Sequence, residues 1–271
     1  MSSPSDLTIS LVQADLRWED PAANRRLIED HIGGLATATQ VVVLPEMFST
    51  GFSMNPERLA ETMDGETVGW MRRMAREHRL ILTGSVIIRD QDRYFNRLVW
   101  MLPNGQYGFY DKRHLFAYGQ EDQHYTPGHR RLVASVNGWR VLLLVCYDLR
   151  FPVWSRQQPR NGTPEFDLII YVANWPDRRI EAWKTLLQAR AIENQCYVAG
   201  VNRVGRDGNG LYYPGESRVI DPLGEIAYQG GASEELATRV LERSRLEAVR
   251  HQFPFWKDAD PFRLVEGGEE S

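Results

Sequence analysis

The segment R-V-L-L-L-V-C-Y-D-L-R-F-P-V-W, residues 140–154, decides the fold class of this chain. Its aliphatic run, residues 141–145, is short and bounded by polar residues, which is typical of a strand buried on both faces. Cys146 follows the run, and Pro152 then favours a helix near residues 152–157. Reactive groups of open α/β sheets gather at such strand ends. On this segment alone, however, Cys146 is equally well explained as a small buried core residue.

The rest of the chain alternates short apolar strands with amphipathic helices. No repeat, linker or change of composition divides it, so the sequence predicts one α/β domain over residues 1–271. Strand–turn–strand patterns between residues 81 and 111 favour mixed sheets. The expected strands are residues 7–13, 41–44, 81–88, 93–101, 108–110, 132–136, 140–145, 167–173, 197–204, 217–220, 225–228 and 237–241; the expected helices are 21–35, 66–77, 180–194 and 244–251; and the expected loops include 119–128 and 208–215. The aromatic residues of the tail, from about residue 252, indicate docking on a neighbouring subunit.

The composition excludes several classes of protein. Hydrophobic residues at 42% and charged residues at 25% are typical of a globular protein, and a net charge of −4 argues against nucleic-acid binding. No apolar run approaches the ~20 residues of a membrane helix, and no signal peptide is visible. The two cysteines, Cys146 and Cys196, form no disulfide framework and fit the cytoplasm. No zinc or phosphate-loop motif is present, so we expect no metal and no cofactor.

Three reactive side chains closely follow predicted strands: those of Glu46, Lys112 and Cys146. Taken singly, Glu46 could cap a turn and Lys112 could be a solvated surface charge. A thiol, with an ordinary pKa of about 8.5, needs a base at neutral pH, and a buried carboxylate can serve. An ammonium group would stabilise the thiolate and the oxyanion formed when it attacks a carbonyl. Together the three residues predict acyl transfer, whereas Cys196, flanked by apolar residues, is expected in the core.

Three blocks of sequence carry a resemblance to a known family. They are V-L-P-E-M-F around Glu46, Y-D-K-R-H-L-F around Lys112 and V-C-Y-D-L-R-F-P around Cys146. Their order and spacing resemble the signature blocks of the nitrilase (carbon–nitrogen hydrolase) superfamily, and the similarity covers essentially the whole chain. H-L-F after the lysine, C-Y-D-L-R-F-P-V-W at the cysteine and N-W-P after the next strand look most like the ω-amidase branch. That branch hydrolyses 2-oxoglutaramate and related ω-monoamides such as 2-oxosuccinamate.

The resemblance implies a fold and a set of roles. The fold would be a four-layer αββα sandwich that forms homodimers. Glu46 would be the general base, Lys112 the oxyanion stabiliser and Cys146 the nucleophile. Glu121, in the loop after the lysine block, would position the lysine and the substrate. The reaction would pass through a thioester without a cofactor, and the backbone N–H of Tyr147 would be a second oxyanion donor.

The residues that bind the rest of the substrate are less well defined by the sequence. A dicarboxylate monoamide needs a cation or several donors for its far carboxylate. The candidate cations are Arg113, Arg150, Arg178, Arg179 and Lys184, although we expect Arg150 to brace the nucleophile turn, and Arg178 and Arg179 could simply be solvated. Phe48, Phe116 and Trp175 could wall the pocket or belong to the core. Three alternatives stay open: an amidase or nitrilase with another small substrate, a non-catalytic binding protein, and a thiol redox sensor.

Overall fold

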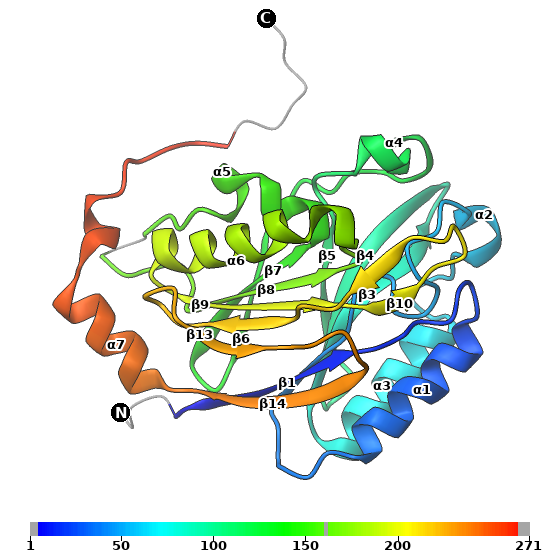
Figure 1. Cartoon of the computed structure of the whole chain (residues 1–271), viewed down its shortest axis with the longest axis horizontal. Coiled ribbons are helices and arrows are strands. Elements are labelled where there is room, and N and C mark those ends of the chain that lie inside the picture. Colours follow the sequence, from blue (N-terminus) through cyan, green and yellow to red (C-terminus); the bar gives the residue numbers. More distant parts are fainter. Residues whose placement is uncertain (1–4, 160–161, 265–271) are drawn as a thin grey trace, which may run out of the picture.

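The computed structural model describes residues 5–159 and 162–264 of the chain. Within these residues, two six-stranded mixed sheets lie face to face (Figure 1). The first sheet has the order β14 (Glu235–Leu241), β1 (Leu7–Gln13), β2 (Val41–Val43), β3 (Ile81–Asp90), β4 (Arg93–Met101) and β5 (Tyr107–Asp111). The second has the order β13 (Ile226–Gln229), β12 (Arg218–Ile220), β9 (Tyr197–Asn202), β8 (Leu168–Ala173), β7 (Trp139–Val145) and β6 (Leu132–Val136). Parallel pairs form the centre of each sheet, and antiparallel strands lie at the edges.

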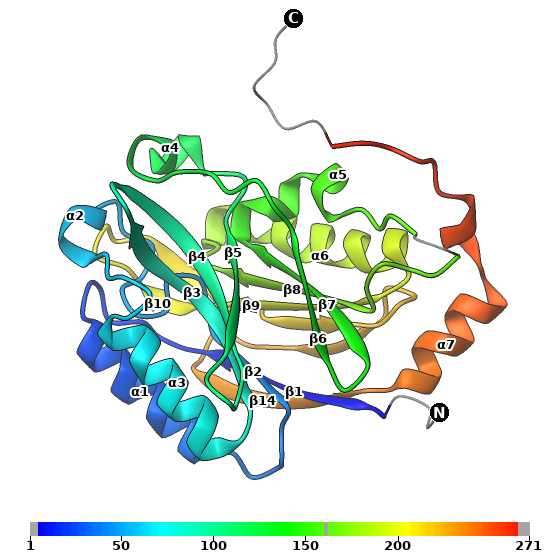
Figure 2. The ribbon, with the colours of Figure 1, turned by 180° about the vertical axis from the view of Figure 1, so that it is seen from behind.

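Helices cover the outer faces of the two sheets, which gives the expected αββα sandwich. Helices α1 (Pro21–Gly33) and α3 (Glu66–His78) lie together against the first sheet, and α6 (Ile180–Asn194) and α5 (Pro152–Ser155) lie over the second (Figures 1 and 2). The shorter helices are α2 (Pro56–Leu59) and α4 (Glu121–His124), with α7 (Arg243–Gln252) at one end of the sandwich. The 3-10 turns are η1 (Ala117–Gly119), η2 (Cys146–Arg150), η3 (Asp177–Arg179) and η4 (Phe255–Asp258).

The two-residue period of a strand explains the layering. Leu11 and Val43 point into the core between the sheets, whereas their neighbours Val12 and Val42 pack toward the helices with Ile28. All of these side chains are almost completely buried. Because each one contributes about 1.5–3 kcal/mol when removed from water, strands that are apolar on both faces fit only between two layers.

The structure corrects three local expectations. The expected loop 119–128 contains α4, so Glu121 begins a short helix. The expected strand 197–204 ends at Asn202, and β10 (Val204–Arg206) pairs instead with β11 (Tyr212–Pro214), which lies in the expected loop 208–215. The turn after the central strand begins at Cys146 itself, as η2, and the helix at residue 152 is shorter than expected.

The sandwich brings the ends of strands from both sheets to one place. Glu46 follows β2 and Lys112 follows β5 in the first sheet, while Cys146 follows β7 and Asn174 follows β8 in the second. The chain thus reaches one site from four strands. In residues 5–159 and 162–264, no helix has the length and apolar character needed to cross a membrane.

Candidate active site

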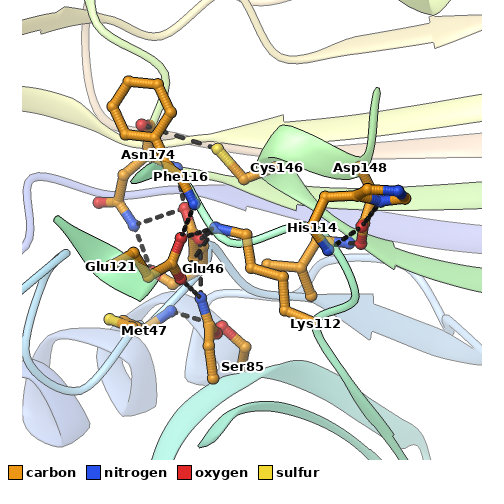
Figure 3. Close-up of polar contacts among 12 residues, drawn as sticks. Glu46, Met47, Ser85, Lys112, His114, Phe116, Glu121, Cys146, Asp148 and Asn174 are labelled. Atoms are coloured by element: carbon orange, nitrogen blue, oxygen red, sulfur yellow. Dashed lines mark hydrogen bonds and ion pairs between the residues drawn. The ribbon is translucent and has the colours of Figure 1, made fainter. Parts of the chain in front are cut away.

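Lys112 lies at the centre of a buried cluster of charges. Its Nζ donates to Oε1 of Glu46 at 2.9 Å and to Oε1 and Oε2 of Glu121 at 3.0 and 2.7 Å (Figure 3). The side chains of all three residues are fully buried. Each of these charges would carry a large desolvation penalty if it were buried alone. The attraction between Lys112 and the two carboxylates offsets that penalty.

The charges of the cluster determine the protonation of its members. Burial alone would lower the pKa of Lys112, but the charges of Glu121 and Glu46 outweigh it and raise that pKa well above its usual value. Burial raises the pKa of Glu121, Lys112 opposes this, and the charge of Glu46 adds to the rise. Lys112 is therefore a permanent cation at physiological pH, which an oxyanion stabiliser must be.

Two asparagines hold the carboxylates in place, and sequence reasoning missed both roles. Nδ2 of Asn96, in β4, donates to Oε1 of Glu46 at 2.9 Å and to Oε1 of Glu121 at 3.1 Å. The backbone N–H of Asn174 donates to Oε2 of Glu46 at 2.9 Å, and its Nδ2 donates to the Glu46 carbonyl at 2.6 Å. A polar residue inside the apolar run of β4, and another at the tip of β8, were the available signals.

Cys146 lies beside this cluster with a strained backbone. Its φ of 44° is in the left-handed region, which costs a residue other than glycine about 1–3 kcal/mol and is common at active sites. The Sγ atom lies 3.9 Å from the carbonyl oxygen of Asn174 (Figure 3). Burial raises the pKa of the thiol well above its ordinary value, and the charge of Glu46 and a hydrogen bond to it add to the rise. The resting group is therefore a thiol, and it needs a base to become the nucleophile.

Asp148, two residues after Cys146, ties the nucleophile turn to the lysine segment. Its Oδ2 accepts from the N–H of Val145 at 3.0 Å and from the hydroxyl of Tyr110 at 2.8 Å. Its Oδ1 accepts from the N–H of His114 at 3.0 Å and lies 2.8 Å from Nδ1 of that ring (Figure 3). One buried carboxylate thus fixes the residue before Cys146 and the residue two positions after Lys112.

A second brace for the same turn comes from α6. Nη2 of Arg190, which is almost fully buried, donates to the carbonyl of Leu149 at 2.6 Å. The guanidinium of Arg150 makes no hydrogen bond or ion pair with the described residues, and it lies over the ring of Trp175 at 5.1 Å. The sequence expectation that Arg150 braces the turn is therefore wrong, because Asp148 and Arg190 do so.

We expect Asp148→Asn to destabilise the protein and to slow catalysis. The amide keeps one acceptor oxygen and places an N–H₂ group against buried donors, so the free energy of unfolding should fall by about 2–4 kcal/mol. The kcat should fall by about 10-fold or more because the thiol and the lysine lose their fixed separation. Urea unfolding and turnover would measure both. Asp122→Asn, on the exposed face of α4, is the matched control, and equal behaviour of the two variants would contradict the role of Asp148.

A cavity of about 430 Å³ opens onto Cys146 and Lys112. Among the predicted site residues, its lining contains Phe116, Tyr147, Arg150, Trp175, Arg178 and Arg179. The other two candidate cations lie elsewhere: Arg113 lines a separate cavity, and Lys184 pairs with Glu181 on α6. Phe48 does not line the pocket, because it is fully buried in the core beneath the first sheet, with its ring centroid 5.8 Å from that of Trp70.

A larger cavity, of about 930 Å³, lies outside the reactive cluster. Its lining includes Arg113, His114, Arg131, Trp154 and Phe262, and it contains none of the residues of the Glu46–Lys112–Cys146 group. We therefore assign the smaller cavity to the substrate. In the described part of the chain, no group of three or more His, Cys, Asp or Glu side chains is arranged to hold a metal ion.

Comparison with known proteins identifies relatives over nearly the whole chain. The family model described as Carbon-nitrogen hydrolase matches residues 8–251. The omega-amidase YafV of Escherichia coli strain K12 is 46% identical over 261 residues, which are 95% of this chain and 98% of that protein. The 2-oxoglutaramate amidase of Bacillus subtilis strain 168 is 32% identical over 254 residues, 93% of this chain and 96% of that one. XC1258 from Xanthomonas campestris, a CN-hydrolase superfamily protein with an arsenic adduct in its active site, matches with a TM-score of 0.93 and 48% identity, covering 96% of this chain and 99% of that one.

Proposed function

Because this chain belongs to the carbon-nitrogen hydrolase family, we propose that it is an ω-amidase, which hydrolyses the terminal amide of 2-oxoglutaramate or 2-oxosuccinamate to the 2-oxo dicarboxylate and ammonia. The observation that carries this proposal is the thiol of Cys146 at the pocket beside the buried Lys112 and its two glutamates. The arrangement supplies a nucleophile, a base and a cation for the oxyanion, which are the groups that acyl transfer requires.

In the first half of the proposed reaction, Cys146 attacks the amide carbon. Because the pKa of Cys146 is raised, the thiol is still protonated when the substrate binds. Glu46 therefore takes the proton of the thiol as the S–C bond forms. The carbonyl π electrons move to oxygen, and the resulting oxyanion is stabilised by Lys112 and by the backbone N–H of Tyr147, each worth about 3–4 kcal/mol. The C–N bond then breaks, and Glu46 returns the proton to the leaving nitrogen, which departs as ammonia.

In the second half, water cleaves the thioester. Glu46 removes a proton from the water as its oxygen bonds to the acyl carbon. The C–S bond breaks, the proton returns to sulfur, and the acid product leaves with the water oxygen. Glu121, which holds Lys112 by a bidentate contact and accepts from the N–H of Phe116 at 2.7 Å, acts as a positioning residue throughout.

Ammonia release from a panel of compounds tests the proposal. The panel contains 2-oxoglutaramate, glutamine, pentanamide and pentanenitrile at equal concentrations. We expect kcat/KM for 2-oxoglutaramate to exceed that for every other compound by about 100-fold or more, because only a complete substrate uses all of the pocket's binding energy. Preference for pentanamide or the nitrile would retain the catalytic cluster and contradict the ω-amidase assignment.

We also infer that the enzyme is a cytoplasmic homodimer and that its tail, from about residue 252, docks on the neighbouring subunit. Phe255 in η4 and Val153 in α5 are 63% and 54% exposed, and both line the same shallow cavity. Apolar side chains exposed together are typical of an interface. Both cysteines are free thiols, which suits a reducing compartment. Sedimentation equilibrium tests the dimer, and a monomeric mass at micromolar concentration would contradict it. Residues 265–271 lie outside the described residues.

A further inference from the structure

The pocket above Cys146 has an excess of positive charge. Arg150, Arg178 and Arg179 line it, and none of their guanidinium groups forms a hydrogen bond or ion pair with the described residues. Asp207 is the acidic residue in the described lining, and its oxygens already accept from the N–H groups of Asn209 and Leu211 and from the hydroxyl of Tyr213. Among the described residues that line the pocket, the positive charge therefore exceeds the negative charge.

The Arg179 guanidinium is held in place without being neutralised. Its Cζ lies 4.9 Å from the centre of the Phe116 ring, and that ring lies 5.0 Å from the ring of Tyr147, the residue after the nucleophile. The carbonyl of Arg179 accepts from Nε1 of Trp175 at 2.7 Å. Stacking fixes the plane of a guanidinium and leaves its N–H edge free for a bidentate contact. Arg179, Phe116 and Tyr147 all line the cavity that opens onto Cys146.

Two of the neighbouring cations, Arg178 and Lys112, are less suited to the same task. Arg178 is exposed to solvent, whereas Arg179 is half-buried, so a contact with Arg179 is screened less by water. Lys112 is already neutralised by Glu46 and Glu121. Arg150 is also half-buried and lies over the Trp175 ring at 5.1 Å, so it is the nearest alternative to Arg179, and a larger loss of 2-oxoglutaramate affinity in Arg150→Met than in Arg179→Met would overturn the choice of Arg179.

We propose that Arg179 binds the carboxylate at the far end of the amide substrate and so makes the enzyme selective for monoamides of short dicarboxylic acids. This inference rests on the proposed function, because it identifies the residue that recognises the part of the substrate remote from the amide. A planar guanidinium donates two parallel N–H groups to a carboxylate, which gives both affinity and a fixed direction for the chain. An amide without that carboxylate gains nothing from Arg179.

Binding to an inactive variant tests the inference independently of turnover. Titration calorimetry would compare 2-oxoglutaramate binding to Cys146→Ala with binding to the same variant carrying Arg179→Met, Arg179→Lys or Arg178→Met. Loss of a charge-assisted contact should raise Kd by about 10- to 100-fold for Arg179→Met. Arg179→Lys should recover part of the affinity because it keeps the charge. Arg178→Met, which removes the same charge from the same pocket, should change Kd by less than about 3-fold.

Turnover of the single variants adds a readout that a structural role would not change. With 2-oxoglutaramate, Arg179→Met should raise KM far more than it lowers kcat, and the loss of kcat/KM should be at least about 10-fold larger for 2-oxoglutaramate than for pentanamide. Equal losses on both compounds, equal Kd changes for Arg178→Met and Arg179→Met, or no binding of 2-oxoglutaramate to Cys146→Ala would each overturn the inference. Failure of the proposed function is recognised separately, as wild-type preference for pentanamide or the nitrile.

Discussion

Cys146→Ala should abolish turnover while leaving the fold intact. Without the sulfur no thioester forms, and loss of a nucleophile that acts with its base as a unit costs about 10⁴-fold or more in kcat. The side chain is small and lies at the pocket, and its Sγ makes weak polar contacts, with the carbonyl of Asn174 and with Glu46, so little packing is lost. The thermal midpoint should therefore move by less than about 4 °C, equivalent to about 1 kcal/mol for a chain of this size.

Cys196→Ala provides the matched control. Cys196 is fully buried in the apolar core, as the sequence predicted, and it does not line the pocket. Its truncation should lower the free energy of unfolding by about 1 kcal/mol and leave kcat unchanged. The two variants separate chemistry from packing: turnover by Cys146→Ala above about 1% of wild type, measured as ammonia release, is incompatible with the proposed mechanism.

Local sequence patterns predicted the elements well where one physical signal dominated. The bounds of β4 and α6 agree with the expected residues 93–101 and 180–194, because turn residues or changes of period mark their ends. Glu46, Lys112 and Cys146 were each placed at the end of a strand, and the structure brings them together. Which strand ends meet, however, depends on how two sheets stack, and no local pattern contains that information.

The supporting residues were missed for a related reason. Asn96 and Asn174 both contact Glu46, which is 50 and 128 positions away in the chain, and Asn96 also contacts Glu121. Asp148 accepts from the nearby N–H of Val145, but its contacts with Tyr110 and His114 depend on how the first sheet packs against the second. The left-handed backbone of Cys146 is equally invisible, since a sequence shows such geometry only when glycine provides it.

Lys112→Met should impair both catalysis and stability, and the loss of stability should grow with pH. Removing the cation leaves Glu46 and Glu121 buried together, and Nζ is the cation that both now contact. Breaking a buried ion pair costs about 3–5 kcal/mol when the remaining charge is uncompensated. Loss of the oxyanion donor should lower kcat by about 10²- to 10³-fold. Lys184→Met is the control, because the exposed pair with Glu181 is worth less than about 1 kcal/mol.

The direction of the pH effect follows from the carboxylates. Burial and the charge of Glu46 already raise the pKa of Glu121, and without Lys112 the opposing contribution is lost, so that pKa rises further. A carboxyl whose pKa is raised on folding keeps its stabilising contribution below the unfolded value of about 4.3 and loses it as the pH rises through the folded value. Lys112 in the wild type has a raised pKa, so its own contribution is constant below about pH 10. The difference in unfolding free energy between Lys112→Met and wild type should therefore be smaller at pH 5 than at pH 8. A difference independent of pH would contradict the inference that Lys112 stabilises the ionised form of Glu121 in the buried cluster.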